Sequence, residues 1–155
     1  MLRINEEIFY YRENLDMNQQ EFGKLFNRNR KTVSGWENEN NNIPLDIIIK
    51  YASVTNSSLD YIFEISEEKI KYSKIDITHK ELGKKLRDLR KSKNITQKKL
   101  ATKLNTNQSV ISRYERGINP INISFFIGVI KELKPSSIDE LFNRVEIKEI
   151  KNDKS

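Results

Sequence analysis

Apolar residues recur at intervals of three or four along most of the chain, in short runs separated by polar residues. In residues 78–144, Leu82, Leu86 and Leu89 fall on one face of a helix. Helix-capping or helix-starting residues open this run and four later ones: Thr78, Thr96, Asn107, Pro120 and Ser136. The pattern predicts five short helices here. Their apolar positions form the expected core: Leu100, Leu104, Ile111, Tyr114, Phe126, Ile127, Ile130, Leu141 and Phe142.

The same pattern occurs twice in the chain. Residues 4–37 align with residues 82–115 at a constant offset of 78, and after a slip of two residues Pro44 aligns with Pro120. Identical polar residues match at this offset: Arg12 with Arg90, Gln19 with Gln97, Asn27 with Asn105, Asn29 with Asn107, and Glu37 with Glu115. Matched polar identities and matched apolar spacing indicate a duplication. The sequence therefore predicts an all-α fold of two five-helix modules, at residues 1–65 and 78–144.

The first module repeats the helix starts of the second. Asn18 and Glu21 form a capping box for its second helix, Asn29 caps its third, and Pro44 suits the first turn of its fourth. Trp36 aligns with Tyr114, and both are expected in the core because each lies one turn after an apolar residue of the third helix.

The segments outside the two modules carry apolar residues of their own. Residues 66–77 form the linker, and Ile70 with Tyr72 alternates at strand spacing, so we expect it to be extended and packed. The tail, residues 145–155, includes Val145, Ile147 and Ile150. Two places are open for these three side chains: between the modules, or at a dimer interface. Residues 152–155 are expected to be disordered.

Composition narrows the class of protein. The 155 residues carry a net charge of +6, 36% are apolar, and no apolar run approaches the roughly 18 residues of a membrane span. The N-terminal residues turn acidic where a secretory signal would become apolar, so we expect a cytoplasmic protein without a membrane partner.

The residues that most enzymes need are scarce. The chain has no cysteine and a single histidine, His79, and its 5 glycines form no phosphate-binding loop. We therefore expect no catalytic residue, no metal and no cofactor, with His79 exposed to solvent.

A short turn joins the second and third helices of each module, which is typical of a helix-turn-helix. Residues 96–101 and 107–117 of the second module, with Arg90, resemble the lambda-repressor-like family, also called the Cro or xenobiotic-response-element family. Residues 18–23 and 33–37 of the first module, with Arg12, are similar more loosely. The resemblance covers both modules and implies two tandem lambda-repressor-like domains that bind double-stranded DNA.

The resemblance implies which residues read bases. The family uses the first, second, fifth and sixth residues of the third helix in the major groove. The matching positions are Arg30, Lys31, Ser34 and Gly35 in the first module, and Gln108, Ser109, Ser112 and Arg113 in the second. Gln108 suits bidentate pairing with adenine and Arg30 with guanine, so the two modules are expected to prefer different sequences.

Other matched positions imply phosphate contacts and a scaffold. Gln19 and Gln97 stand where the family has a glutamine that donates to phosphate and braces the first residue of the recognition helix. Further phosphate contacts are expected from Lys98, Lys99, Asn107, Asn119 and Arg28. Two pairs occupy the positions of a partly buried ion bridge and are expected to be structural: Arg12 with Glu37, and Arg90 with Glu115.

Charge divides the two modules. Residues 1–65 hold 7 basic and 10 acidic side chains, whereas residues 78–155 hold 18 and 9. Because phosphate neutralisation supplies most non-specific DNA affinity, the second module is expected to supply most of it. The first module still has Arg28, Arg30 and Lys31 at the start of its third helix, so DNA and a protein partner both remain open for it.

The sequence as a whole predicts a sequence-specific transcriptional regulator, of the repressor type found in phages and mobile elements. It binds either as a homodimer on a two-fold site or as one chain on an asymmetric site. The alternative is an antitoxin or other inhibitor that uses residues 1–65 for a protein partner and the second module for autoregulation. RNA binding is less favoured, because no aromatic residues are arranged to stack on single strands.

Overall fold

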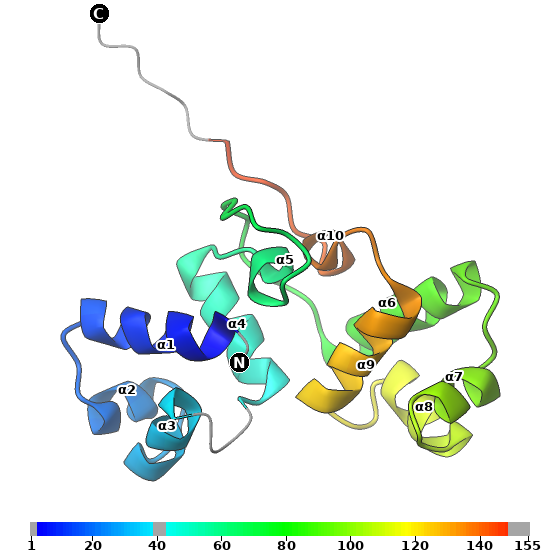
Figure 1. Cartoon of the computed structure of the whole chain (residues 1–155), viewed down its shortest axis with the longest axis horizontal. Coiled ribbons are helices and arrows are strands. Elements are labelled where there is room, and N and C mark those ends of the chain that lie inside the picture. The colour runs from blue at the N-terminus through cyan, green and yellow to red at the C-terminus, as the bar shows by residue number, and fades with distance from the viewer. Residues whose placement is uncertain (1–2, 39–42, 149–155) are drawn as a thin grey trace, which may run out of the picture.

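The computed structural model describes residues 3–38 and 43–148, and every regular element in them is a helix. The first module contains α1 (Arg3–Asn14), α2 (Gln19–Leu25), α3 (Arg30–Glu37), α4 (Leu45–Thr55) and α5 (Leu59–Ile62). The second contains α6 (His79–Ser92), α7 (Gln97–Lys103), α8 (Gln108–Glu115), α9 (Ile123–Leu133) and α10 (Ile138–Leu141). Figure 1 shows the two modules side by side, with α5 and α10 between them. The predicted tandem five-helix fold is confirmed. The predictions for Ile150 and for residues 152–155 fall outside the described residues.

Side chains that accept from backbone N–H groups start most of the helices. Asn18 and Glu21 form a complete capping box at α2, and Asn29 caps α3. Two helices of the second module begin later than the pattern predicted. Asn122 caps α9 and Ser137 caps α10, because their side chains accept from the N–H groups three residues further on.

Large apolar side chains fill the centre of each module. In the first module, Phe22 and Trp36 are almost completely buried, and in the second, Ile111 and Phe126 are. Tyr114, which aligns with Trp36, is only half-buried, because its hydroxyl accepts from the Asn122 side chain near the surface. Four further residues expected in the core are also only half-buried: Leu104, Ile127, Ile130 and Leu141.

The two modules place their first helix against the third in different ways. In the second module, Gly83 lets α6 lie against the end of α8, and an added Cβ would be 2.5 Å from the carbonyl oxygens of Tyr114 and Glu115. In the first module, Asn5 occupies the matching position and donates from its side chain to the Trp36 carbonyl at 2.7 Å. The same helix pair is thus held by close backbone packing in one copy and by a hydrogen bond in the other.

Two aspartates at the same repeat position join the modules. Asp60 of α5 and Asp139 of α10 each accept hydrogen bonds from the start of the other module's last helix. Asp139 accepts from the first two N–H groups of α5 at 2.8 and 3.0 Å, and Asp60 accepts from the first N–H group of α10. The capping hydroxyls of Ser58 and Ser137 donate to the same carboxylates at 2.8 and 2.7 Å. The last helix of each module is therefore completed by the other module.

Arg144 provides the positive charge at this junction. Its guanidinium is fully buried and bonds Asp139 at 2.8 Å and the carbonyls of Ser57, Ser73 and Ala52 at 2.6, 2.7 and 3.1 Å. Burial lowers the pKa of Arg144, and the nearby Asp139 carboxylate opposes that shift. Because its three carbonyl partners come from α4, the turn before α5, and the linker, Arg144 binds the second module to three segments around the first.

The linker pairs with the tail through backbone atoms. Tyr72 forms an isolated antiparallel bridge with Glu146, and the N–H of Ser73 donates to the Val145 carbonyl at 2.8 Å. The sequence left packing between the modules open for the side chains of Val145 and Ile147. Those side chains are 70% and 44% exposed, so the backbone of this segment, rather than its apolar side chains, makes the contact.

Replacing Arg144 tests the junction. We expect Arg144→Met to lower the free energy of unfolding by about 3 to 5 kcal/mol, because Asp139 is left as a buried carboxylate without its cation. Urea unfolding followed by circular dichroism measures the change. Arg116→Met, at an exposed arginine, is the matched control and is expected to stay within about 0.5 kcal/mol of the parent.

A pair of glycine substitutions tests the close packing of α6 on α8. We expect Gly83→Ala to destabilise the second module by about 1 to 3 kcal/mol, since the new methyl group meets backbone carbonyls that cannot move aside. Gly128→Ala is the control, because the added methyl group meets only the flexible Leu104 side chain and gains about 0.5 to 1 kcal/mol of helix propensity. Equal melting temperatures for the two variants would contradict this packing.

Candidate nucleic-acid interface

Two matching turns carry the third helix of each module outward. Residues 26–29 join α2 to α3, and residues 104–107 join α7 to α8. Asn27 and Asn105, which align in the repeat, both have a φ of 56°, a left-handed conformation that asparagine adopts more readily than most residues. Figure 1 shows α3 and α8 along the same edge of the molecule, near its two ends and away from α5 and α10. The two candidate recognition helices therefore lie along one edge of the molecule.

The start of α8 is exposed and braced from behind. Gln108, Ser109 and Arg113 are exposed, and Ser112 is half-buried on the same helix. The Gln108 amide donates to the side-chain oxygen of Gln97 in a long hydrogen bond of 3.4 Å. This hydrogen bond holds the exposed Gln108 side chain at the first turn of α8, the position for which the sequence predicts a base contact.

The start of α3 has different chemistry. Arg30 and Lys31 are exposed, whereas Ser34 is half-buried and its hydroxyl accepts from the Asn38 side chain at 3.1 Å. Gly35, at the position of Arg113, is buried and has no side chain to offer. Arg30 takes the place of Gln108, so Gln19 has no amide to brace. The first module thus presents two cations where the second presents an amide and a hydroxyl.

A buried ion pair fixes the scaffold behind each candidate recognition helix. Arg90 pairs with Glu115 at 2.8 Å, and both residues are less than 10% exposed. The Arg90 guanidinium also donates to the Ile95 carbonyl at 2.7 Å, which holds the loop before α7. Gln97 donates to Glu115 at 3.4 Å, so a continuous set of contacts runs from the ion pair to Gln108.

The first module contains the same arrangement. Arg12 bonds Glu37 at 2.5 Å and the Met17 carbonyl at 2.9 Å, and Gln19 donates to Glu37 at 2.7 Å. The hydrogen bond from Arg12 to Glu37 raises the pKa of the guanidinium, and partial burial opposes this shift. The carboxylate of each pair therefore receives both the arginine of the first helix and the glutamine of the second.

The residues expected to contact phosphate lie in different settings. Lys98 and Lys99 are exposed at the start of α7, and Asn119 is half-buried after α8. Asn107 is exposed, and its side-chain oxygen caps α8 by accepting from the Val110 N–H at 3.1 Å. Arg28 is half-buried, and its guanidinium donates to two carbonyls of its own turn at 3.2 and 3.3 Å.

Not every lysine of the basic second module belongs to this face. Lys103 pairs with Glu132 of α9 at 3.6 Å, and Lys85 bonds the Asn143 side chain beside the module junction. Two lysines of the basic run in the sequence therefore contact residues of this chain instead of standing free at the expected phosphate-binding surface.

The expectations for metal and membrane contacts can be compared with the described residues. His79 is exposed at the start of α6, and residues 3–38 and 43–148 contain no cluster of His, Asp and Glu able to hold a metal ion. Within the same ranges, no helix has the length and apolar character of a bilayer span.

Sequence reasoning missed the residues of the junction. Asp60 and Asp139 align in the repeat. The available signal was that both copies have the same charged residue near the start of an otherwise apolar helix. Arg144 aligns with Ile65, so the repeat gave no signal for it.

Comparison with known proteins supports the same two regions. A family model described as helix-turn-helix matches residues 8–62 and again residues 86–141. Among solved structures, the chain is similar to the clp gene regulator ClgR from Corynebacterium glutamicum, at 23% identity and a TM-score of 0.40 over 44% of this chain and 87% of that chain. A second crystal structure of that regulator matches at 24% identity and a TM-score of 0.39, over 43% and 69%. No curated protein sequence matches the chain.

Substitutions at the exposed starts of α7 and α8 distinguish base contacts from phosphate contacts. We expect Gln108→Ala to weaken binding to the preferred duplex by about 5-fold to 150-fold and to leave non-specific binding nearly unchanged, since the lost contact is to a base. Lys98→Ala with Lys99→Ala should weaken all duplexes and reduce the salt slope by about 2. Fluorescence anisotropy over a salt series measures both, and an equal loss on every duplex from Gln108→Ala would contradict the assignment.

Proposed function

This chain belongs to the Cro/C1-type helix-turn-helix family and is a DNA-binding transcription regulator, and we propose that it acts as a repressor by occupying its operator. The observation that carries the proposal is the exposed start of α8, where Gln108 is braced by Gln97 in front of a buried ion pair. A protein bound to its operator in the cytoplasm excludes polymerase from the promoter, and this mechanism requires no catalytic step. The layout of two readers within 155 residues resembles regulators of phages and mobile elements, which we propose as the source.

We propose that a single chain reads one asymmetric site. The mutual capping of α5 and α10, with Arg144 buried behind it, holds the modules in one relative orientation. The third helices lie along the same edge of the molecule in that orientation (Figure 1). One chain therefore offers two readers, as a two-fold dimer does, but with unlike side chains. Arg30 and Lys31 favour guanine in one half-site, whereas Gln108 favours adenine in the other.

The acidic surface of the first module supports a second candidate function. Glu6, Glu13, Asp16 and Glu21 are exposed on α1, at its end and on α2, where they would repel phosphate. The same surface suits a basic protein partner, as in an antitoxin whose second module controls its own promoter. Arg28, Arg30 and Lys31 at the start of α3 favour DNA instead, and on that ground we prefer the repressor.

Selection of preferred duplexes from a random pool, with the mass of the complex measured alongside, tests the proposal. We expect an asymmetric site bound by one chain. A symmetric site bound by two chains would overturn the single-chain arrangement and leave the DNA-binding function intact. A co-purified basic protein together with no preferred duplex would favour the antitoxin instead.

Two substitutions in α3 test whether the first module reads DNA. We expect Arg30→Ala with Lys31→Ala to shorten the footprint at one end of the selected duplex and to weaken binding by about 10-fold, because both side chains face outward at the helix start. Lys74→Ala, at an exposed linker lysine, is the control and should leave the footprint intact. An unshortened footprint in the α3 variant would assign the first module to protein contacts.

A further inference from the structure

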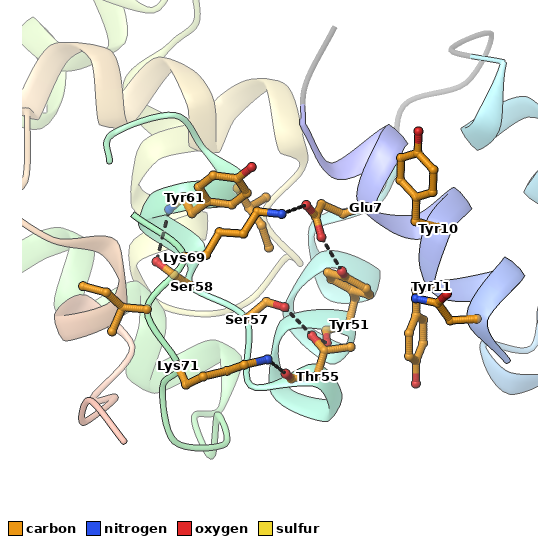
Figure 2. Close-up of a pocket in the computed structure, with 13 residues that line it drawn as sticks. Glu7, Tyr10, Tyr11, Tyr51, Thr55, Ser57, Ser58, Tyr61, Lys69 and Lys71 are labelled. Atoms are coloured by element: carbon orange, nitrogen blue, oxygen red, sulfur yellow. Dashed lines mark hydrogen bonds and ion pairs between the residues drawn. The ribbon is translucent and has the colours of Figure 1, made fainter. Parts of the chain in front are cut away.

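A cleft of about 280 Å³ lies in the first module, away from α3. Its walls come from α1, α4, α5 and the linker, and four tyrosines line it: Tyr10, Tyr11, Tyr51 and Tyr61. Figure 2 shows Glu7 at the centre of this group, between Tyr51 and Lys69. The role proposed above for the first module makes no use of this cleft.

Glu7 is the charged group that the cleft holds most firmly. The Tyr51 hydroxyl donates to one Glu7 oxygen at 3.0 Å, and Tyr51 is almost completely buried. Burial, followed by the charge of Glu7, raises the pKa of Tyr51, so its hydroxyl remains a donor at physiological pH. The Glu7 side chain is only 26% exposed. Its second oxygen, Oε1, faces the ammonium group of Lys69 (Figure 2).

The ammonium group of Lys69 lies at that second oxygen, but only loosely. Its Nζ is 3.6 Å from Glu7 Oε1, and its side chain is 69% exposed. The same Nζ lies 5.2 Å from the centre of the Tyr61 ring, within range of a cation–π contact. A carboxylate oxygen and an aromatic face thus define a position for a cation, and Lys69 occupies that position. Because an exposed ion pair contributes little free energy, the lysine can be displaced at small cost.

We propose that this cleft binds a small organic ammonium compound, whose charged group replaces that of Lys69 between Glu7 and Tyr61 and whose apolar body packs on the tyrosine rings. The aromatic lining favours a cation, because the faces of the rings carry negative potential. An anion would have to lie against Glu7. The other basic group of the cleft, Lys71, is exposed and lies 3.5 Å from the Thr55 carbonyl.

The cleft also borders the module junction. Ser57 and Ser58 line it, and the same residues bond the second module: the Ser57 carbonyl accepts from Arg144 and the Ser58 hydroxyl donates to Asp139. An occupant of the cleft would therefore contact the segment that sets the relative orientation of the two readers.

Isothermal titration of the full chain, without DNA, with 2-phenylethylamine and with 1,4-diaminobutane tests this proposal, and 3-phenylpropionate serves as the matched anion. We expect at least one amine to bind and the anion not to bind. Glu7→Gln should weaken the amine at least 10-fold, because the ammonium loses its counter-charge. Lys69→Met should tighten it several-fold, because the competing internal cation is removed. Lys74→Met, at an exposed lysine outside the cleft, is the control and should change neither value.

Lys69→Met tests whether the Lys69 ammonium group competes with the ligand for the same position. Tighter amine binding in this variant supports the proposal, because a structural role for Lys69 would weaken binding instead. Weaker amine binding in Lys69→Met would overturn it in favour of a structural role for Lys69. Binding of 3-phenylpropionate in place of the amines would overturn it in favour of an anion site. Failure of both amines to bind the parent chain and Lys69→Met up to about 10 mM would also overturn it.

Discussion

The exchange of helix caps between Asp60 and Asp139 is the interaction on which the arrangement of the molecule depends. α5 and α10 are four-residue helices, too short to be stable alone. Asp139 accepts from the first two N–H groups of α5, and Asp60 accepts from the first N–H group of α10. Burial raises the pKa of Asp60, against the hydrogen bonds from Ser137 and Ile138 that lower it. A buried pair of carboxylates carries a large desolvation cost, and the guanidinium of Arg144 offsets part of it.

The junction is symmetric in its aspartates and asymmetric in its cation. Arg144 aligns with Ile65, which is 40% exposed, so only the second module supplies a guanidinium. When α5 pairs with α10 in one chain, the two carboxylates share one cation. Its guanidinium also bonds two segments of the first module and the linker. Two copies of the first module would bring the carboxylates together with no arginine. The sequence difference therefore favours pairing of the unlike modules over pairing of two first modules.

In each module, a short set of side-chain contacts also fixes the third helix to the first and second helices. In both, an arginine of the first helix and a glutamine of the second converge on the glutamate that ends the third. Beyond this shared scaffold the outward residues differ, with Arg30 in one module where Gln108 lies in the other. Duplication has thus preserved the buried contacts that the fold requires, while the exposed positions and the charge of the two copies have diverged.

The sequence by itself determined the helices, their repeat and the exposed ends of α3 and α8, because apolar spacing and capping residues act over three or four positions. The repeat aligned Arg12 with Arg90 and Glu37 with Glu115, and the resemblance to the family implied that each arginine pairs with its glutamate. Only the tertiary structure decided the junction and the cleft. Arg144 meets Ala52 across 92 positions, and Glu7 meets Tyr51 across 44. Contacts between residues so far apart depend on how the helices pack, and no local pattern of residues records that.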